Sequence, residues 1–404
     1  MGSLAKWGGK VVLTDKVIED GVVVTKGQEI AWVGPEADLP EEWADAPSAG
    51  LPAGSIITPG LIDVHCHGGG GASFPDSLTL EDVRTAATEH LKNGTTTLVA
   101  SLVTAPVDVL ETRANLLAEA TEREIIQGIH YEGPFLSEAR CGAQDPRYLI
   151  PATPDVTKRL VKAAKGYAVS MTFAPERAAD PEGRESVKIL IDGNILPSWG
   201  HTDCDIADAE GAVKAGVQDI AEKDTPTRGG RATITHLFNG MRPLHHRAPG
   251  PISVFLEAAK RGEVVVEMIN DGTHLDPSLV RKVVEMVGRD NCVFVTDAMA
   301  AAGMPDGQYQ LGPQAVRVKD GVARLVDGDA IAGGTARLID CLRTAVKRSE
   351  LSLVDAVYLT TQQGANILGL TDRGRLEEGL RADLLVMNEN LDVITVIRKG
   401  QAAI

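Results

Sequence analysis

The sequence predicts an α/β protein: a TIM-like (β/α)8 barrel with a small β-sandwich domain formed by both chain termini. Three observations carry this prediction. Eight short apolar segments recur in the centre of the 404-residue chain, each followed by a turn and a helix-period stretch. The first 55 and last 30 residues instead alternate short β-type runs with turns. Finally, the residues with metal-binding or acid–base side chains fall at the ends of the apolar segments.

The eight central segments have the apolar character of strands that are buried on both faces, as parallel sheets require. The stretches between them, such as SLTLEDVRTAATEHLKNG, are helix candidates that end in glycine. Eight strand–helix units predict a closed barrel rather than an open sheet. The predicted strands are SIITPGLIDV, TTTLVAS, IIQGIHY, AVSMTFA, ILPSW, ATITH, VVVEMIN and CVFVT.

The two ends of the chain are each too short to bury a core alone. Runs such as KVVLTDKVI and GVVVTKG at the start, and ADLLVMN and LDVITVIRKG at the end, read as strands with turn punctuation. We therefore expect residues 1–57 and 372–404 to pack together as the small domain. Residues 58–371 would form the barrel inserted between them.

Composition excludes several functional classes. No apolar run approaches the roughly 20 residues of a membrane span, and the N-terminus lacks a secretory signal pattern, so a cytoplasmic location is expected. The five cysteines are scattered and form no CxxC pair, which favours reduced thiols over disulfides or a thiolate zinc site. A net charge of −16 argues against nucleic acid as a partner, although a local pocket could still bind a small anion.

Histidine and carboxylate side chains mark the ends of the predicted strands. Because all strands of a barrel end at the same face, such residues converge on one pocket. Imidazole and carboxylate ligands suit zinc, iron, cobalt or nickel better than magnesium or calcium. Five ligands exceed the three that one catalytic zinc usually takes, which leaves open a two-metal site that shares Glu132. The residues are His65 and His67 on the first strand, Glu132 on the third, His201 on the fifth, His236 on the sixth, His274 beyond the seventh and Asp297 after the eighth.

Other features have two interpretations. Asp297 is either a helix N-cap or a proton shuttle facing the metal, and its position favours the shuttle. The glycines at 68–71 either bind phosphate through backbone N–H groups or form a flexible turn. His90 and His130 are expected to be structural, and Cys141 a free loop thiol.

Several longer segments carry a resemblance to the amidohydrolase superfamily and, within it, to the N-acetylglucosamine-6-phosphate deacetylases. The similarity extends over essentially the whole chain. The segments are PGLIDVHCHGGGGASF, YEGPFLSEARCGAQDP, WGHTDCD, THLFNGMRPLHHRAPG, NDGTHLDP, FVTDAMAAAG and the closing GRLEEGLRADLLVMN.

The resemblance implies a role for each matching position. It implies one or two divalent metal ions per subunit, with zinc first and iron, cobalt, nickel, manganese or cadmium as alternatives. Asp297 would also be the catalytic acid–base, and His274 would contact the substrate near the scissile amide. The implied metal residues are His65, His67, Glu132, His201, His236 and Asp297, and the implied substrate residues are Asn239, Gly240, Arg247, His274, Gln144 and Ala143.

The resemblance also implies a homodimer, in which Arg247 reaches the phosphate in the neighbouring subunit's site. One departure concerns the loop after EGPF. Many relatives have Lys-Gly-x-His there, whereas this chain has Cys141, Gly142, Ala143 and Gln144. A basic residue and an imidazole are thereby lost, so the substrate contacts of this loop and the substrate range stay open.

The expected reaction is metal-assisted hydrolysis of the N-acetyl group of N-acetylglucosamine 6-phosphate, in amino-sugar catabolism and cell-wall recycling. A metal lowers the pKa of bound water towards about 7, and Asp297 would move the proton. The nearest alternatives are a D-aminoacylase, a dihydroorotase-like enzyme or a base deaminase. A remote alternative is a non-catalytic scaffold of the same fold.

Overall fold

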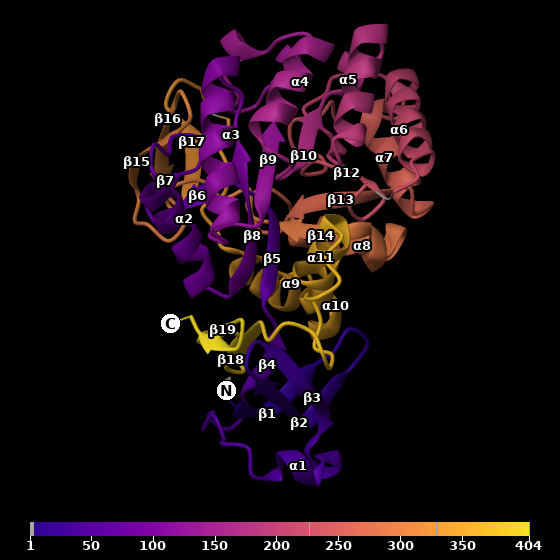
Figure 1. Cartoon of the computed structure of the whole chain (residues 1–404). Coiled ribbons are helices and arrows are strands. Elements are labelled where there is room, and N and C mark those ends of the chain that lie inside the picture. Colours follow the sequence, from indigo (N-terminus) through magenta and orange to yellow (C-terminus); the bar gives the residue numbers. More distant parts are fainter. Residues whose placement is uncertain (1–3, 226, 329, 404) are drawn as a thin grey trace.

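The computed structural model describes residues 4–225, 227–328 and 330–403. A barrel of strands, surrounded by helices, stands on a smaller β-sheet unit that contains the first and the last described strands (Figure 1). Among the described residues, no helix combines the length and the apolar character needed to cross a bilayer.

Eight parallel strands form the barrel, and each pairs with the next along the chain. All the predicted central strands are present, and the nearly closed barrel confirms the predicted fold class. The seam between the first and last strand is closed by irregular bonds: Asp297 N donates to His65 O over 2.9 Å, and His67 N donates to Ala298 O over 2.7 Å. The strands are β5 (Leu61–Cys66), β8 (Thr95–Leu102), β9 (Gly128–Glu132), β10 (Ala168–Phe173), β11 (Leu196–Trp199), β12 (Ala232–Ile234), β13 (Val264–Ile269) and β14 (Cys292–Val295).

Helices cover the outside of the barrel, so its strands are buried on both faces. Side-chain caps begin several of these helices; Thr79 and Asp82, for example, form a reciprocal capping box at α2. The helices are α2 (Leu80–Lys92), α3 (Val107–Glu122), α4 (Pro154–Ala163), α5 (Pro181–Asp192), α6 (Ile206–Ala221), α7 (Gly250–Lys260), α8 (Pro277–Val287), α9 (Leu338–Lys347), α10 (Leu353–Thr360) and α11 (Gln362–Leu368).

The smaller unit is one seven-stranded sheet in the order β20-β19-β18-β4-β1-β2-β3. The two ends of the chain therefore come together in one small β-unit, as predicted, and they do so within a single sheet. The sheet curls on itself, because Ile30 N donates to Leu380 O and Ala382 N donates to Gln28 O. The strands are β1 (Leu4–Val12), β2 (Val17–Lys26), β3 (Glu29–Pro35), β4 (Ile56–Pro59), β18 (Leu384–Met387), β19 (Val393–Arg398) and β20 (Gln401–Ala402), with the short helix α1 (Glu41–Ala44) between β3 and β4.

Gly60 joins the two units, between β4 and β5. A Cβ at this position would lie 2.2 Å from Thr96 Oγ1, so the close approach leaves room only for glycine. We propose that the domain boundary lies here rather than after residue 57, because the latter position falls inside β4. For the C-terminal part we propose the predicted boundary, between residues 371 and 372.

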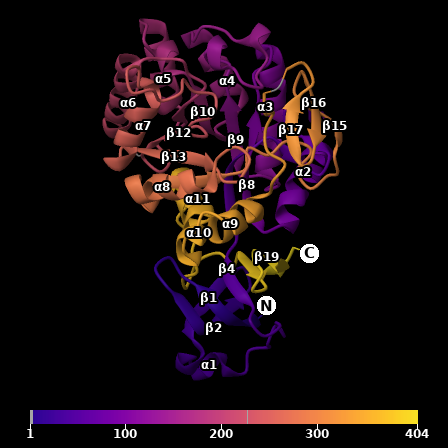
Figure 2. The same cartoon turned by 180° about the vertical axis from the view of Figure 1, so that it is seen from behind.

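A three-stranded antiparallel sheet follows the eighth barrel strand and was not predicted. It consists of β15 (Gly307–Leu311), β16 (Gln314–Lys319) and β17 (Val322–Leu325). Figure 2 shows it at the side of the barrel, next to α3. Its buried residues Leu311, Val316 and Val318 pack against Val103 and Met299 of the barrel. The glycines at 68–71 form a small hairpin of β6 (Gly68–Gly69) and β7 (Ala72–Ser73).

Candidate metal centre and catalytic site

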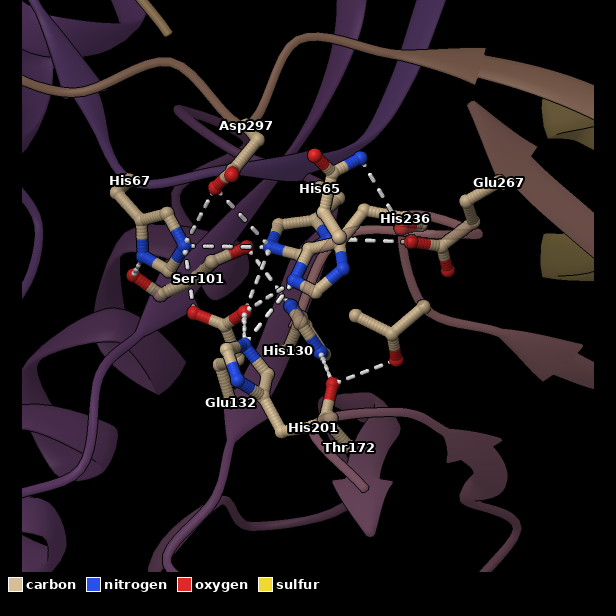
Figure 3. Close-up of polar contacts among 12 residues, drawn as sticks. His65, His67, Ser101, His130, Glu132, Thr172, His201, His236, Glu267 and Asp297 are labelled. Atoms are coloured by element: carbon tan, nitrogen blue, oxygen red, sulfur yellow. Dashed lines mark hydrogen bonds and ion pairs between the residues drawn. The ribbon is translucent and has the colours of Figure 1, made fainter. Parts of the chain in front are cut away.

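The predicted metal residues lie together at one end of the barrel (Figure 3). Glu132 is the last residue of β9, whereas His201, His236 and Asp297 each lie two residues beyond a barrel strand. At these three positions the backbone adopts positive φ angles of 45°, 28° and 47°. Such angles are uncommon outside glycine and gather at functional sites. The chain therefore turns sharply at the very residues whose side chains point into the centre.

Glu132 is shared by two groups of possible ligands. The first, called the His201 group, consists of Glu132, His201 and His236. Glu132 Oε1 lies 2.9 Å from Nε2 of both histidines, whose Nε2 atoms are 3.1 Å apart. One carboxylate oxygen and two imidazole nitrogens thus converge on a single point.

The second, called the His67 group, consists of His65, His67, Asp297 and the same Glu132. His67 Nε2 lies 3.1 Å from both Glu132 Oε2 and Asp297 Oδ1, and 3.2 Å from His65 Nε2. Glu132 therefore presents one oxygen to each group.

Neighbouring acceptors determine which nitrogen of each histidine carries its proton. His65 Nδ1 faces Glu267 Oε2 over 3.1 Å, His67 Nδ1 faces the carbonyl of Ser101 over 3.2 Å, and His201 Nδ1 faces the carbonyl of Arg140 over 2.8 Å. A carbonyl or carboxylate oxygen only accepts, so each Nδ1 carries a proton, and in the neutral form of the ring, the form that binds a metal, the Nε2 lone pair points inward. Metal-binding histidines are held in this way.

The metal-free cluster favours positive charge. Burial lowers the pKa of His67, but hydrogen bonds to Asp297 and Glu132, together with the charges of both carboxylates, raise this pKa to about 10. Burial raises the pKa of Glu132, yet its bonds to His201, His236 and His67 hold it well below the usual range. The ionised carboxylates thus attract a proton onto the facing histidines in the metal-free site, and the same carboxylates and Nε2 atoms suit a divalent transition metal that would replace the proton.

His274 lies at the same cavity and is oriented by Asp271. Its Nδ1 is 2.7 Å from Asp271 Oδ2, while Asp271 Oδ1 accepts from the backbone N–H groups of Thr273 and His274. Burial lowers the pKa of His274, but the hydrogen bond to Asp271 and the charges of Asp271 and Asp297 together outweigh burial, so the net pKa is raised. His274 is therefore more readily protonated than a free imidazole, and in its cationic form it can donate a hydrogen bond from Nε2.

The cavity above the ligands has a volume of about 280 Å³. It brings most of the predicted substrate residues beside the two ligand groups. Gly240 needs its φ of 59° and its lack of a side chain, because a Cβ would lie 2.8 Å from His201 Nδ1. The lining residues are His67, Glu132, Gly142, Ala143, Gln144, His201, His236, Asn239, Gly240, His274, Leu311, Asp297, Ala330, Ile331 and Gly333.

Arg247 is the predicted substrate residue that does not line the cavity of its own chain. Arg247 is exposed on the loop between β12 and α7. Leu244 of the same loop is also exposed, at 53% of its surface. The residues of this loop that line the cavity are His236, Asn239 and Gly240, near its start.

Some contacts of the site were not predicted from the sequence. Glu267, within the apolar run VVVEMIN, orients His65; a lone carboxylate in a buried strand was the available signal. Leu311 and Ile331 line the cavity from the unpredicted region after β14. His130 and His90 have structural contacts, as expected: His130 bonds Ser101 and Thr172, and His90 bonds the carbonyl of Gly68.

Comparison with known proteins agrees with this geometry. The amidohydrolase family matches residues 56–403. N-acetylglucosamine-6-phosphate deacetylase of Bacillus subtilis strain 168 is 32% identical, over 97% of this chain and 95% of its own length. The human enzyme of the same name is 30% identical, over 98% and 92%. N-acetylgalactosamine-6-phosphate deacetylase of Shewanella sp. strain ANA-3 is 29% identical, over 91% and 88%.

Solved structures show the same similarity. A mutant N-acetyl-D-glucosamine-6-phosphate deacetylase from Mycobacterium smegmatis, in complex with N-acetyl-D-glucosamine-6-phosphate, superimposes with a TM-score of 0.90 at 34% identity, over 100% of both chains. The Thermotoga maritima enzyme has a TM-score of 0.82 at 27% identity, over 98% of both chains. The chain therefore belongs to the amidohydrolase family, in the group that contains the N-acetylglucosamine-6-phosphate deacetylases.

Proposed function

We propose that this protein hydrolyses the N-acetyl group of N-acetylglucosamine 6-phosphate and releases acetate and glucosamine 6-phosphate. The observation that carries the proposal is the convergence of two ligand groups, Asp297 and His274 on one cavity. The full-length similarity to deacetylases of this substrate supports the same reaction.

One or two divalent transition metal ions would be held by the His201 group and the His67 group. A metal bound there would lower the pKa of water and polarise the acetamide carbonyl. We propose zinc as the first choice because imidazole and carboxylate ligands suit it, with iron, cobalt, nickel, manganese or cadmium as alternatives.

Asp297 moves the proton in the proposed reaction. Burial raises its pKa, but the hydrogen bond to His67 and the positive charges of His65 and His67 together outweigh burial, so the net pKa is lowered and the carboxylate is ionised at neutral pH. It accepts a proton from the attacking water while the water oxygen bonds to the acetyl carbon. It then returns this proton to the nitrogen as the C–N bond breaks, because an amine leaves poorly as an anion. His274 donates a hydrogen bond to the acetyl oxygen, where negative charge develops.

Asn239 and Gly240 would hold the phosphate end of the substrate, at the rim of the cavity. We propose that the exposed Arg247 completes this pocket in a neighbouring subunit, which makes the active form a homodimer. A guanidinium suits phosphate through paired hydrogen bonds, and it would offset the chain's net charge of −16 locally. A cytoplasmic role in amino-sugar breakdown and cell-wall recycling fits the five free cysteines.

The test of this proposal compares substrates on purified, metal-loaded protein. We expect acetate release from N-acetylglucosamine 6-phosphate with a kcat/KM about 100-fold or more above that for unphosphorylated N-acetylglucosamine, because hydrogen bonds to charged groups contribute about 1.5–3 kcal/mol each. N-acyl-D-amino acids, dihydroorotate and amino-bearing nucleobases should not react. If the protein turned over one of these three substrate classes instead of the phosphosugar, it would be the corresponding alternative amidohydrolase. If it turned over none of the tested substrates, a non-catalytic scaffold would be favoured.

Asp271→Asn tests the role given to His274. The raised pKa of His274 depends on the Asp271 carboxylate, so the variant should lose the cationic donor at lower pH. We expect the alkaline fall of kcat/KM to move to lower pH, measured as a pH–rate profile.

The same pair makes a prediction for stability. The raised pKa of His274 contributes stability that is fully present below the ordinary pKa of about 6.5 and is lost as pH rises through the folded-state pKa. Denaturant unfolding should therefore show wild type and Asp271→Asn converging as pH rises. An unchanged pH–rate profile, together with stability curves of wild type and Asp271→Asn that stay parallel over pH, would contradict the role given to His274 and Asp271.

A further inference from the structure

We propose that Gln144 is a positioning residue that holds the Glu132 carboxylate between the two ligand groups. This inference rests on the proposed metal-dependent function, and it assigns to Gln144 a role other than the predicted substrate contact. Gln144 lies between the 3-10 turns Glu138–Arg140 and Pro146–Tyr148 and is 4% exposed. Its Nε2 donates to Glu132 Oε2 over 2.5 Å, and its Oε1 accepts from Thr104 N over 2.7 Å.

The orientation of the Gln144 amide follows from its partners. A backbone N–H only donates, so the side-chain oxygen of Gln144 must face Thr104 N. The NH2 group then has to face Glu132, which as a carboxylate only accepts. Thr104 also donates its hydroxyl to the carbonyl of Glu132 over 3.2 Å. Thr104, in the segment after β8, therefore bonds both the backbone of Glu132 at the end of β9 and the side chain of Gln144, which in turn bonds the Glu132 carboxylate.

The contact determines how Glu132 divides its two oxygens. Oε1 faces His201 and His236, whereas Oε2 faces His67 and Gln144. Rotation of the carboxylate would break the bond from Gln144, which is short and strengthened by the negative charge. Gln144 thus keeps Oε1 directed to the His201 group. An amide does not titrate, so the contact persists over the working pH range.

Metal affinity without substrate is the direct measurement. Groups that orient metal ligands typically change metal affinity 10–100-fold, so we expect Gln144→Ala to raise the Kd for zinc by about that factor in a chelator competition. Gln144→Asn keeps the amide but is one methylene shorter, and it should show a similar loss. Cobalt-substituted Gln144→Ala should also show an altered visible absorption spectrum. Glu138→Gln, at an exposed position in the turn Glu138–Arg140 that does not line the cavity, is the control and should leave both readouts unchanged.

Kinetics separate the two roles of Gln144. If it positions Glu132, kcat should fall at limiting metal and recover with excess metal, while KM stays within about twofold of wild type. A raised KM with unchanged zinc affinity and cobalt spectrum would instead make Gln144 a substrate contact and overturn the proposal, as would no change in either quantity. Because the affinity and spectrum need no substrate, a protein that deacetylates nothing would overturn the proposed function and still test Gln144.

Discussion

Replacing Asp297 by asparagine is expected to lower kcat by about 10²–10⁴-fold or more, the range that a positioned acid–base group contributes. Asparagine has nearly the same shape but cannot accept and return a proton. The His201 group does not include Asp297, so metal bound there and the substrate affinity should be retained. The measurement is kcat together with metal content on the same preparation.

Asp192→Asn is a matched control for this substitution, because Asp192 is exposed at the end of α5 and does not line the cavity. It should leave kcat unchanged. Near-normal turnover of metal-replete Asp297→Asn would show that Asp297 is not the proton shuttle. The alternative interpretation from the sequence, a helix N-cap, would then be favoured.

Glu132→Gln is expected to have the largest effect on metal binding. Glu132 is the one residue common to both ligand groups, and its charge faces three buried histidines, His67, His201 and His236. Removing one partner of a buried ionic cluster costs about 3–5 kcal/mol. We expect loss of metal from both groups, little remaining activity and a lower free energy of unfolding.

His67→Asn provides the comparison for Glu132→Gln. It removes a ligand of the His67 group alone, so it should abolish at most one metal equivalent and leave the His201 group loaded. Metal content by elemental analysis and unfolding by denaturant distinguish the two variants. Equal metal loss from both would contradict the division into two groups that share Glu132.

The parts predicted from the sequence were those governed by periodic patterns. Apolar runs of strand length located all eight barrel strands, and the barrel rule that strand ends share one face placed Glu132, His201, His236 and Asp297 together. The packing of the two chain ends against each other was expected because neither end is long enough to bury a core alone. The structure achieves this packing by pairing β4 with β18.

The parts not predicted depend on contacts between distant segments without a periodic signal. Glu267 is a lone carboxylate in an otherwise apolar strand, and its pairing with His65 depends on barrel register, which the sequence pattern does not give. The sheet β15–β17 alternates like any exposed hairpin, so nothing in the pattern places Leu311 over the cavity. The bond from Gln144 to Glu132 depends on how an irregular loop folds back, which local propensity does not determine.

The most direct test of the metal-dependent mechanism is metal add-back to chelated protein, with acetate release from N-acetylglucosamine 6-phosphate measured at each step. We expect no turnover without metal, and activity that rises in proportion to occupancy as the first ion per subunit binds to wild type and to His67→Asn. Full turnover by protein that elemental analysis shows to be metal-free, or none by fully loaded protein, would contradict it.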